Sequence, residues 1–161
     1  MIAKAQEEFG MEFTVGTEVE YQVLESPGST EVLKWSRRKG WGATYGRGSS
    51  RFIFQFRMNL DAVDALEKAG VSVWKFHPED GCGVHEMPLS PADSMTAVDN
   101  LVYAHDIIKS CAKKNGPHAT MMPQAIKDGP AIAQQMHISF KNEEYGDSFL
   151  TAISVAPQRC S

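Results

Sequence analysis

The sequence predicts an α+β domain built on a mainly antiparallel sheet. Residues 12–24 (EFTVGTEVEYQVL) alternate apolar with polar side chains, which is the period of a strand with one buried face. Residues 71–89 read as strand, turn and strand, which is typical of a hairpin with antiparallel arms. Residues 91–115 place apolar side chains at helical spacing and end before Gly116 and Pro117. Separate helices beside hairpin-connected strands are typical of the α+β class.

The composition is that of one globular domain. With 161 residues and 42% hydrophobic content, the chain has enough apolar side chains for a core. Its 20 acidic and 16 basic residues give a net charge of −4 and no basic stripe, so we expect no nucleic acid or membrane partner. No apolar run reaches the roughly 18 residues of a membrane span, and the N-terminus lacks the apolar stretch of a signal peptide, so we expect a cytoplasmic protein.

The first half of the chain is predicted to contain two helices and two strands. A short helix over residues 2–9 precedes the alternating strand, and the basic and aromatic residues 32–45 are expected to form a surface excursion. Residues 51–56 (RFIFQF) alternate bulky apolar side chains, which favours a second strand. Asn59 is then expected to cap a helix over residues 60–70. Its apolar stripe is expected to consist of Val63, Leu66 and Ala69.

The second half is predicted to contain the hairpin, the longest helix and two further strands. The hairpin carries Glu79 at its bend and Glu86 on its return arm. Strands are expected over residues 118–122 and 134–141. The apolar face of the helix is expected to consist of Met95, Val98, Leu101, Val102, Ile107, Ile108 and Cys111. The polar face of the last strand is expected to consist of Gln135, His137 and Ser139.

Acidic side chains gather on the polar faces of these predicted strands. Glu18 and Glu20 lie two residues apart on one strand, so both point to the same side. An exposed strand would leave them solvated, as a plain surface hairpin would leave Glu79 and Glu86. In a cavity, like charges repel unless a cation offsets them, and Mg²⁺ and Mn²⁺ prefer such hard oxygen ligands. The residues alone leave both interpretations open, a solvated face and a divalent metal site.

Four segments of the chain together resemble the catalytic domain of glutamine synthetase. They are TEVEY at 17–21, AGVSVWKFHPEDGCGVHE at 69–86, ADSMTAVDNLVYAHDIIKSCAKKNGPHATMMPQ at 92–124 and MHIS at 136–139. Their order and spacing are close to those of the family, and they look closest to the glutamine-synthetase-like branch that includes the fungal FluG-type proteins. Residues 1–161 are therefore expected to form a single, partial glutamine-synthetase-like catalytic domain.

The resemblance implies a curved sheet that lines a funnel-shaped cavity, with helices on its convex face. In that family, paired divalent cations, Mg²⁺ or Mn²⁺, bind ATP, glutamate is activated as an acyl phosphate, and an amine or ammonia attacks it. By position, the ligands of the first metal are Glu20, Glu79 and Glu86. A ligand of the second metal is Glu18, and Gln135 is a metal ligand at the position of the family's metal-linked histidine. The nucleotide contacts are His137 and Ser139.

The chain departs from the family pattern at several of these positions. Gln135 stands where the family has its metal-linked histidine, and an amide oxygen is a weaker ligand than imidazole for such an ion. A second register, which pairs Met136 and His137 with the family's Met-His, keeps that histidine but loses the next histidine and the serine. Val84 replaces a glutamine of the family, and residues 131–134 (AIAQ) replace its glycine-rich approach to the last strand.

Two functional classes follow from these matches and departures. The first is an ATP-dependent ligase that joins a glutamate-like carboxylate to an amine or ammonia, as a homo-oligomer or with a partner chain. The second is a non-catalytic metal-binding, nucleotide-binding or assembly subunit derived from the family. Family members also carry a small N-terminal domain and a C-terminal half with a further metal glutamate, phosphate-binding arginines and a flap glutamate. None of these is matched here, so the 161-residue chain alone is expected to be inactive.

Overall fold

The computed structural model describes residues 2–29, 50–79, 81, 83–129, 131–142 and 146–155. The described helices are α1 (Ile2–Phe9), α2 (Ser50–Lys68) and α3 (Ser94–Asn115). The described strands are β1 (Met11–Leu24), β2 (His77–Pro78), β3 (Val84–Pro88), β4 (Ala92–Asp93), β5 (His118–Thr120), β6 (Gln134–Asn142) and β7 (Gly146–Val155). The surface excursion expected over residues 32–45 lies outside the described residues.

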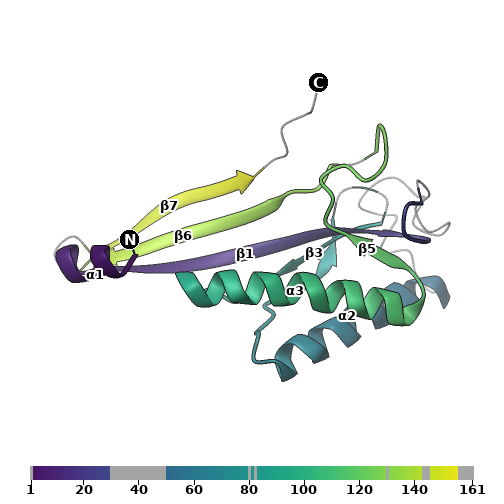
Figure 1. Ribbon diagram of the computed structural model, residues 1–161, viewed down its shortest axis with the longest axis horizontal. Helices are drawn as coiled ribbons and strands as arrows, with labels where there is room; N and C mark the ends of the chain where they lie inside the picture. The colour runs from purple at the N-terminus through teal and green to yellow at the C-terminus, as the bar shows by residue number, and fades with distance from the viewer. Residues whose placement is uncertain are drawn as a thin grey trace.

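Strand β1 is the centre of the sheet. The described part of the sheet has seven strands in the order β2-β3-β1-β6-β7, and the short strands β4 and β5 also pair with β1. Every pairing between these strands is antiparallel. Figure 1 shows β1 running the length of the molecule, with β3 and β6 beside it. The predicted α+β class with an antiparallel sheet is confirmed.

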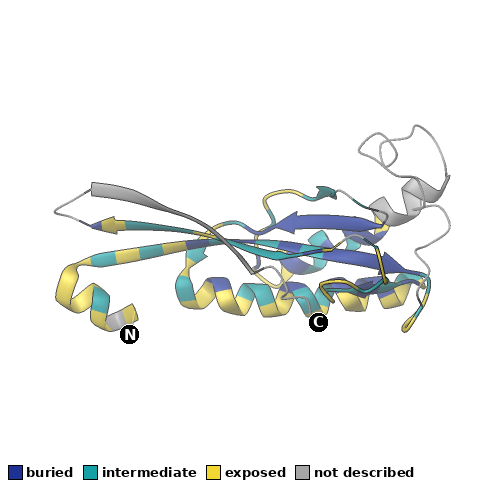
Figure 2. Ribbon diagram, turned by 90° about the horizontal axis from the view of Figure 1, so that it is seen from above, coloured by how far each residue is buried: buried dark blue, intermediate teal, exposed yellow. Residues whose placement is uncertain are grey.

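The helices cover one face of this sheet. α3 runs along β1, and α2 packs against α3 (Figure 1). Val19, Tyr21 and Val23 of β1 point toward the helices and are fully buried, at 0% exposure. Figure 2 shows the buried residues concentrated where β1, β3 and α3 meet. Because side chains alternate along a strand, the even-numbered residues of β1 point to the opposite face.

Helix α2 begins earlier than predicted and includes a predicted strand. Residues 51–56, which we expected to be a strand, are helical, and α2 continues to Lys68. That prediction is wrong because the preference of aromatic residues for strands depends strongly on their surroundings. A helix can run through this segment because no glycine or proline interrupts residues 50–69. Asn59 is therefore not a helix cap but an interior residue of α2, with 2% exposure. The buried stripe of α2 consists of Met58, Ala62 and Leu66, whereas Ala69 is exposed.

A buried polar trio joins α2 to the sheet. The Tyr21 hydroxyl donates to Asn59 Oδ1 at 2.6 Å, and Asn59 Nδ2 lies 3.2 Å from His85 Nδ1. Burial is the main cause that lowers the pKa of His85 to about 4, and the charge of nearby His77 lowers it further. The ring is therefore neutral near pH 7, and its Nδ1 accepts a hydrogen bond from the Asn59 amide. The trio holds His85 on the helix side of β3, which leaves its neighbour Glu86 on the other face.

Helix α3 faces the sheet with part of the predicted apolar stripe and with alanines. Ile108 and Cys111 are buried as predicted, and Leu101 and Ile107 pack partly buried against the core. Its buried residues are Ala97, Ala104, Ile108, Cys111 and Ala112. Met95, Val98 and Val102, which we expected on the buried face, are exposed instead. The reason is that alanines let a helix approach a strand closely. The face of α3 that carries the alanines therefore packs against β1 more tightly than a face of larger side chains would.

The start of α3 also differs from the prediction. The helix was expected from residue 91, but Ala92–Asp93 pair with β1 as β4, and the helix begins at Ser94. The Asp93 carboxylate accepts hydrogen bonds from the N–H groups of Met95 and Thr96, both at 3.1 Å. Hydrogen bonds to the carboxylate, those from Thr96 above all, lower the pKa of Asp93, as expected for an ionised N-cap residue. Gly116 ends the helix with a φ of 103°, as predicted.

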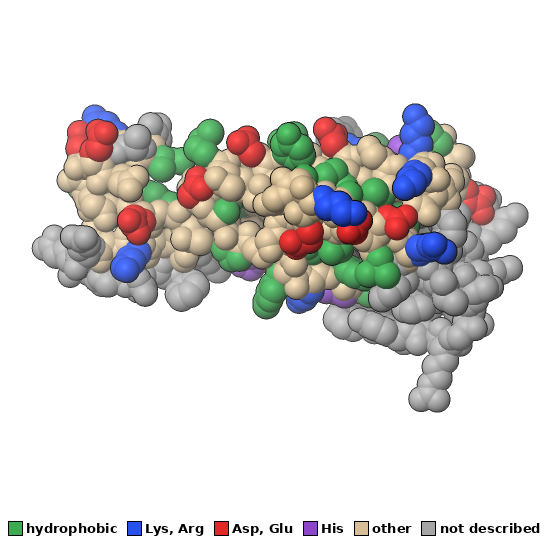
Figure 3. All heavy atoms as spheres, turned by 90° about the horizontal axis from the view of Figure 1, so that it is seen from below, with side chains coloured by type: hydrophobic (Ala, Val, Ile, Leu, Met, Phe, Trp, Pro, Cys, Tyr) green, Lys and Arg blue, Asp and Glu red, His purple; other side chains and the backbone are tan. Residues whose placement is uncertain are grey.

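The outer surface of the helix layer mixes charged and apolar side chains. Figure 3 views the molecule from below and shows acidic, basic and hydrophobic groups interspersed on this side. Exposed apolar side chains of α3 include Met95, Val98, Val102 and Tyr103.

In the part of the chain that the structure describes, no helix is both long enough and apolar enough to cross a membrane.

Candidate metal centre

Four glutamates converge on the sheet face opposite the helices. β1 and β3 pair Glu20 directly with Glu86, and Glu18 points to the same side two residues earlier. The Cβ atoms of directly paired residues lie about 5 Å apart. Glu79 lies at the bend of the hairpin, where its N–H donates to the carbonyl of Val84 at 3.0 Å. The charges of Glu18, Glu20 and Glu79 all act on Glu86, so the structure brings together the carboxylates that the sequence singled out.

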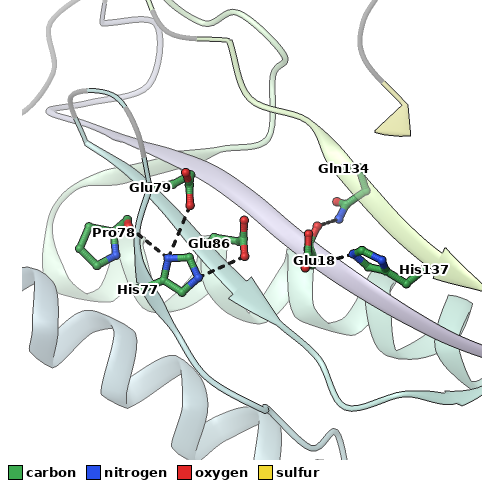
Figure 4. A network of polar contacts seen from close by, with 7 residues as sticks. All are labelled: Glu18, His77, Pro78, Glu79, Glu86, Gln134 and His137. Carbon is green, nitrogen blue, oxygen red and sulfur yellow. Dashed lines mark hydrogen bonds and ion pairs between the residues drawn. The ribbon is translucent and has the colours of Figure 1, made fainter. Parts of the chain in front are cut away.

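A histidine outside the predicted site lies between two of these carboxylates. His77 is paired with Glu86 in the register of β2 and β3. As Figure 4 shows, its Nε2 lies 3.2 Å from Glu86 Oε1 and its Nδ1 lies 3.5 Å from Glu79 Oε2. One ligand atom from each of the three residues lies within 4.8 Å of the other two. The cluster therefore combines carboxylate and imidazole donors at the spacing of a small metal site.

Strand β6 approaches Glu18 from the other side of β1. The register of the two strands places Gln135 opposite Glu18, with His137 and Ser139 farther along the same face. His137 Nε2 lies 3.2 Å from Glu18 Oε1 (Figure 4). This arrangement agrees with the predicted polar face of the strand.

The segment that enters β6 holds both glutamates of β1. The N–H of Ala133 donates to Glu20 Oε2 at 2.7 Å. The Gln134 side chain donates its amide to the Glu18 carbonyl, and its Oε1 lies 2.9 Å from His105 Nε2 on α3. Since α3 lies behind the sheet, this chain of contacts ties the position of Glu18 to the helix layer. His105 thus makes a structural contact between α3 and β6.

Burial and the repulsion among the carboxylates both disfavour negative charge in the cluster. Burial raises the pKa of Glu20, and the charges of Glu79 and Glu18 raise it further. Burial also raises the pKa of Glu86, with Glu18 as the next largest cause, while His77 acts in the opposite direction. These directions mean that the ionised forms are disfavoured in the folded chain. A cation placed among the oxygens would remove that penalty.

The residues of the cluster fit a divalent cation. Mg²⁺ takes carboxylate oxygens and keeps several waters, and first-row transition ions accept carboxylate together with imidazole. These requirements are matched by the closely spaced donors of His77, Glu79 and Glu86. The raised pKa values of Glu20 and Glu86 show in addition that a positive charge among the carboxylates would be favourable. The arrangement is therefore chemically suited to holding a cation.

Sequence reasoning missed three of the groups around the carboxylates, namely His77, Gln134 and the Ala133 N–H. A signal for His77 was present, because it precedes Glu79 by two residues in an extended segment and strand alternation puts both on one side. No local signal existed for the Ala133 contact, because it joins positions 113 residues apart.

Comparison with known proteins points to one family. The family model described as the catalytic domain of glutamine synthetase matches residues 1–152. Protein FluG of Emericella nidulans is 26% identical over 156 residues, which cover 93% of this chain and 18% of FluG. Glutamine synthetase of Mycobacterium tuberculosis strain H37Rv is 36% identical over 78 residues, which cover 48% of this chain and 18% of that enzyme. The chain thus spans 18% of the length of these curated relatives.

Solved structures show the same fold. The structure titled apo GmaS without ligand has a TM-score of 0.76 at 20% identity, with 91% of this chain and 34% of that chain covered. Glutamine synthetase of Plasmodium falciparum has a TM-score of 0.66 at 18% identity, with 90% of this chain and 33% of that chain covered. The family match over most of the chain confirms the resemblance read from the sequence, and this chain belongs to the glutamine synthetase catalytic domain family.

Proposed function

We propose that this chain is the metal- and nucleotide-binding part of an ATP-dependent carboxylate–amine ligase. The proposed substrates are a glutamate-like carboxylate and an amine or ammonia, and the proposed cofactors are ATP and Mg²⁺ or Mn²⁺. The proposal treats residues 1–161 as one partial catalytic domain, active in the cytoplasm as a homo-oligomer or with a partner chain. Family membership supports the ligase class.

The observation that carries the proposal is the convergence of carboxylates from β1 and the hairpin on one sheet face. The proposed ligands of the first metal are Glu20, Glu79 and Glu86. The proposed ligands of the second metal are Glu18 and Gln135. The proposed nucleotide contacts are His137 and Ser139. A domain with no cation to bind would have little reason to hold four carboxylates where they repel one another.

The chemistry of such a ligase needs charge stabilisation more than proton transfer. A substrate carboxylate oxygen attacks the γ-phosphorus of ATP and ADP leaves; the amine nitrogen then attacks the acyl carbon, phosphate leaves, and the amine loses a proton. Bound divalent cations offset the charge of the phosphate oxygens and align the transferring group. His137 holds the Glu18 carboxylate, and the Ala133 N–H holds that of Glu20, so these oxygens keep fixed positions.

Divalent cations are expected to raise the melting temperature of the chain, and Glu20→Gln is expected to abolish the rise. A ligand at 100 times its Kd stabilises the folded state by about 2.7 kcal/mol, which corresponds to roughly 5 to 10 °C for a chain of this size. The measurement is thermal unfolding with and without Mg²⁺ or Mn²⁺ at millimolar concentration. In the absence of metal, Glu20→Gln should unfold no earlier than the native chain, because it removes a charge that is disfavoured on folding.

Glu12→Gln is the matched control for this experiment. Glu12 lies on the same strand, but it is exposed and pairs with Lys141 away from the cluster. The variant therefore removes an identical charge from β1 and is expected to keep the full metal-induced rise. A rise that survives Glu20→Gln, or no rise in the native chain at millimolar metal, would count against the proposed site.

A non-catalytic metal- or nucleotide-binding subunit is the second candidate, and one observation favours it. Gln135, rather than a histidine, lies opposite Glu18, and an amide oxygen is a weak ligand for the second cation. A subunit of this kind would bind a cation and nucleotide without turning substrates over. Glutamate-dependent phosphate release by the complete protein, with any partner chain present, distinguishes the two candidates.

A further inference from the structure

We infer that His77 is an imidazole ligand of the cation bound by Glu79 and Glu86, and that it gives this site a preference for a first-row transition ion over Mg²⁺. The inference rests on the proposed function, since it concerns the same carboxylates. It assigns a role to a residue that the sequence resemblance left without one. Its basis is the hydrogen bonding of the ring, the spacing of the donor atoms and the chemistry of imidazole.

The hydrogen bond of Nδ1 fixes which ring nitrogen is free to bind a metal. His77 Nδ1 lies 3.1 Å from the carbonyl oxygen of Pro78, and a carbonyl oxygen only accepts, so Nδ1 carries a proton. Glu79 Oε2, at 3.5 Å from the same nitrogen, is a second acceptor on that side. In protein metal sites, a ligating histidine usually donates its other N–H to a backbone carbonyl or a carboxylate. His77 has this arrangement, with Nε2 left to face the cluster.

The spacing between Nε2 and the carboxylate is that of two ligands on one ion. Nε2 lies 3.2 Å from Glu86 Oε1. Neighbouring ligands about 2.1 Å from an ion are about 3.0 Å apart in an octahedral site and about 3.4 Å apart in a tetrahedral one. One ligand atom of each of the three residues lies within 4.8 Å of those of the other two, and ligands on opposite sides of such an ion are about 4.2 Å apart. A movement of about half an ångström by the flexible glutamate side chains therefore brings all three donors onto one ion.

The position of the three side chains suits a bound ion. Exposure is 22% for His77, 25% for Glu79 and 10% for Glu86, so the donors are partly shielded while one side stays open to water and phosphate oxygens. Carboxylates serve Mg²⁺ and Mn²⁺ alike, whereas imidazole binds transition ions better than Mg²⁺. Adding imidazole to these carboxylates thus shifts the selectivity of the site. The opposite assignment is a protonated ring that only forms ion pairs with its two neighbours.

Pulsed electron paramagnetic resonance of bound Mn²⁺ separates the two assignments, because it detects the ¹⁴N nucleus of a coordinated imidazole. The native chain loaded with Mn²⁺ is expected to show this nitrogen signal, and His77→Gln is expected to lose it. Competition of Mg²⁺ against Mn²⁺ gives a second readout. His77→Gln is expected to weaken Mn²⁺ binding by at least about 10- to 100-fold, because losing a residue that only supports a ligand already costs that much, and to weaken Mg²⁺ binding much less.

His137→Gln is the matched control, because it removes the other imidazole that contacts a carboxylate of the cluster, that of Glu18. It is expected to keep the nitrogen signal. Mn²⁺ binding without a nitrogen signal, or with a signal that persists in His77→Gln, overturns this inference and leaves the proposed function standing. A complete absence of Mn²⁺ binding overturns both. The spectrum of the native chain decides the first point without a variant, so a folding defect in His77→Gln would not obscure the result.

Discussion

Replacing Asn59 by alanine is expected to lower the free energy of unfolding by about 2 to 4 kcal/mol, because it leaves two buried polar groups without their partner. The Tyr21 hydroxyl donates to Asn59 Oδ1, and His85 Nδ1 accepts from its amide. Both partners are at most 3% exposed, so water does not replace the lost contacts. The measurement is urea unfolding of the native chain and the variant. The two free energies of unfolding are compared with the same dependence on urea concentration for both chains.

Two control variants show whether the loss comes from the trio. Tyr21→Phe removes one hydroxyl and keeps the contact between Asn59 and His85, so a smaller loss of about 1 to 2 kcal/mol is expected. Lys68→Ala breaks an exposed ion pair with Asp64 at the end of the same helix and is expected to change stability by less than about 0.5 kcal/mol. An Asn59→Ala loss no larger than that of Lys68→Ala would contradict the role given to the trio.

The 161-residue chain on its own is expected to show no measurable glutamate-dependent turnover, even with both cations bound. Phosphoryl transfer depends on positive charge around the transferring group, and a single arginine can be worth on the order of 10³ in rate. The ion pairs described at the carboxylates come from His77 and His137. The His137 side chain is 53% exposed, so this sheet face is open to water, which competes with the amine for an acyl phosphate.

The assay for this prediction follows phosphate release from ATP in the presence of Mg²⁺, glutamate and ammonium. The reaction without glutamate serves as the blank, and the complete protein with any partner chain serves as the positive comparison. Steady glutamate-dependent release by the isolated chain would contradict the prediction. It would also mean that positive charge reaches the site from elsewhere in the chain. The first residues to test would then be Arg37, Arg38, Arg47 and Arg51.

The sequence predicted the face of each long strand well because strand alternation is strict. Once β1 was recognised, the side on which Glu18 and Glu20 lie followed directly, and the same reasoning placed Gln135 and His137 on one face of β6. The convergence of these strands depended on the family resemblance, because pairing between distant segments leaves no local pattern in the sequence.

The sequence predicted the helices less well because apolar spacing does not reveal which face will be buried. α3 turns alanines such as Ala104 inward and leaves Val102 exposed, since small residues permit a closer approach to β1. α2 extends through a stretch whose aromatic alternation favoured a strand. The burial of Asn59 could not be predicted either, because its partners lie 38 and 26 positions away.

The central claim is that the carboxylates on this sheet face form a cation site that also receives nucleotide, and calorimetric titration tests it most directly. Mn²⁺ is titrated into the metal-free chain, followed by ATP in the presence of Mg²⁺. We predict saturable binding of Mn²⁺ that is lost in Glu86→Gln and retained in Glu12→Gln, and nucleotide binding that requires the cation. No heat beyond dilution at millimolar Mn²⁺, or equal binding by the Glu86→Gln chain, would contradict the claim.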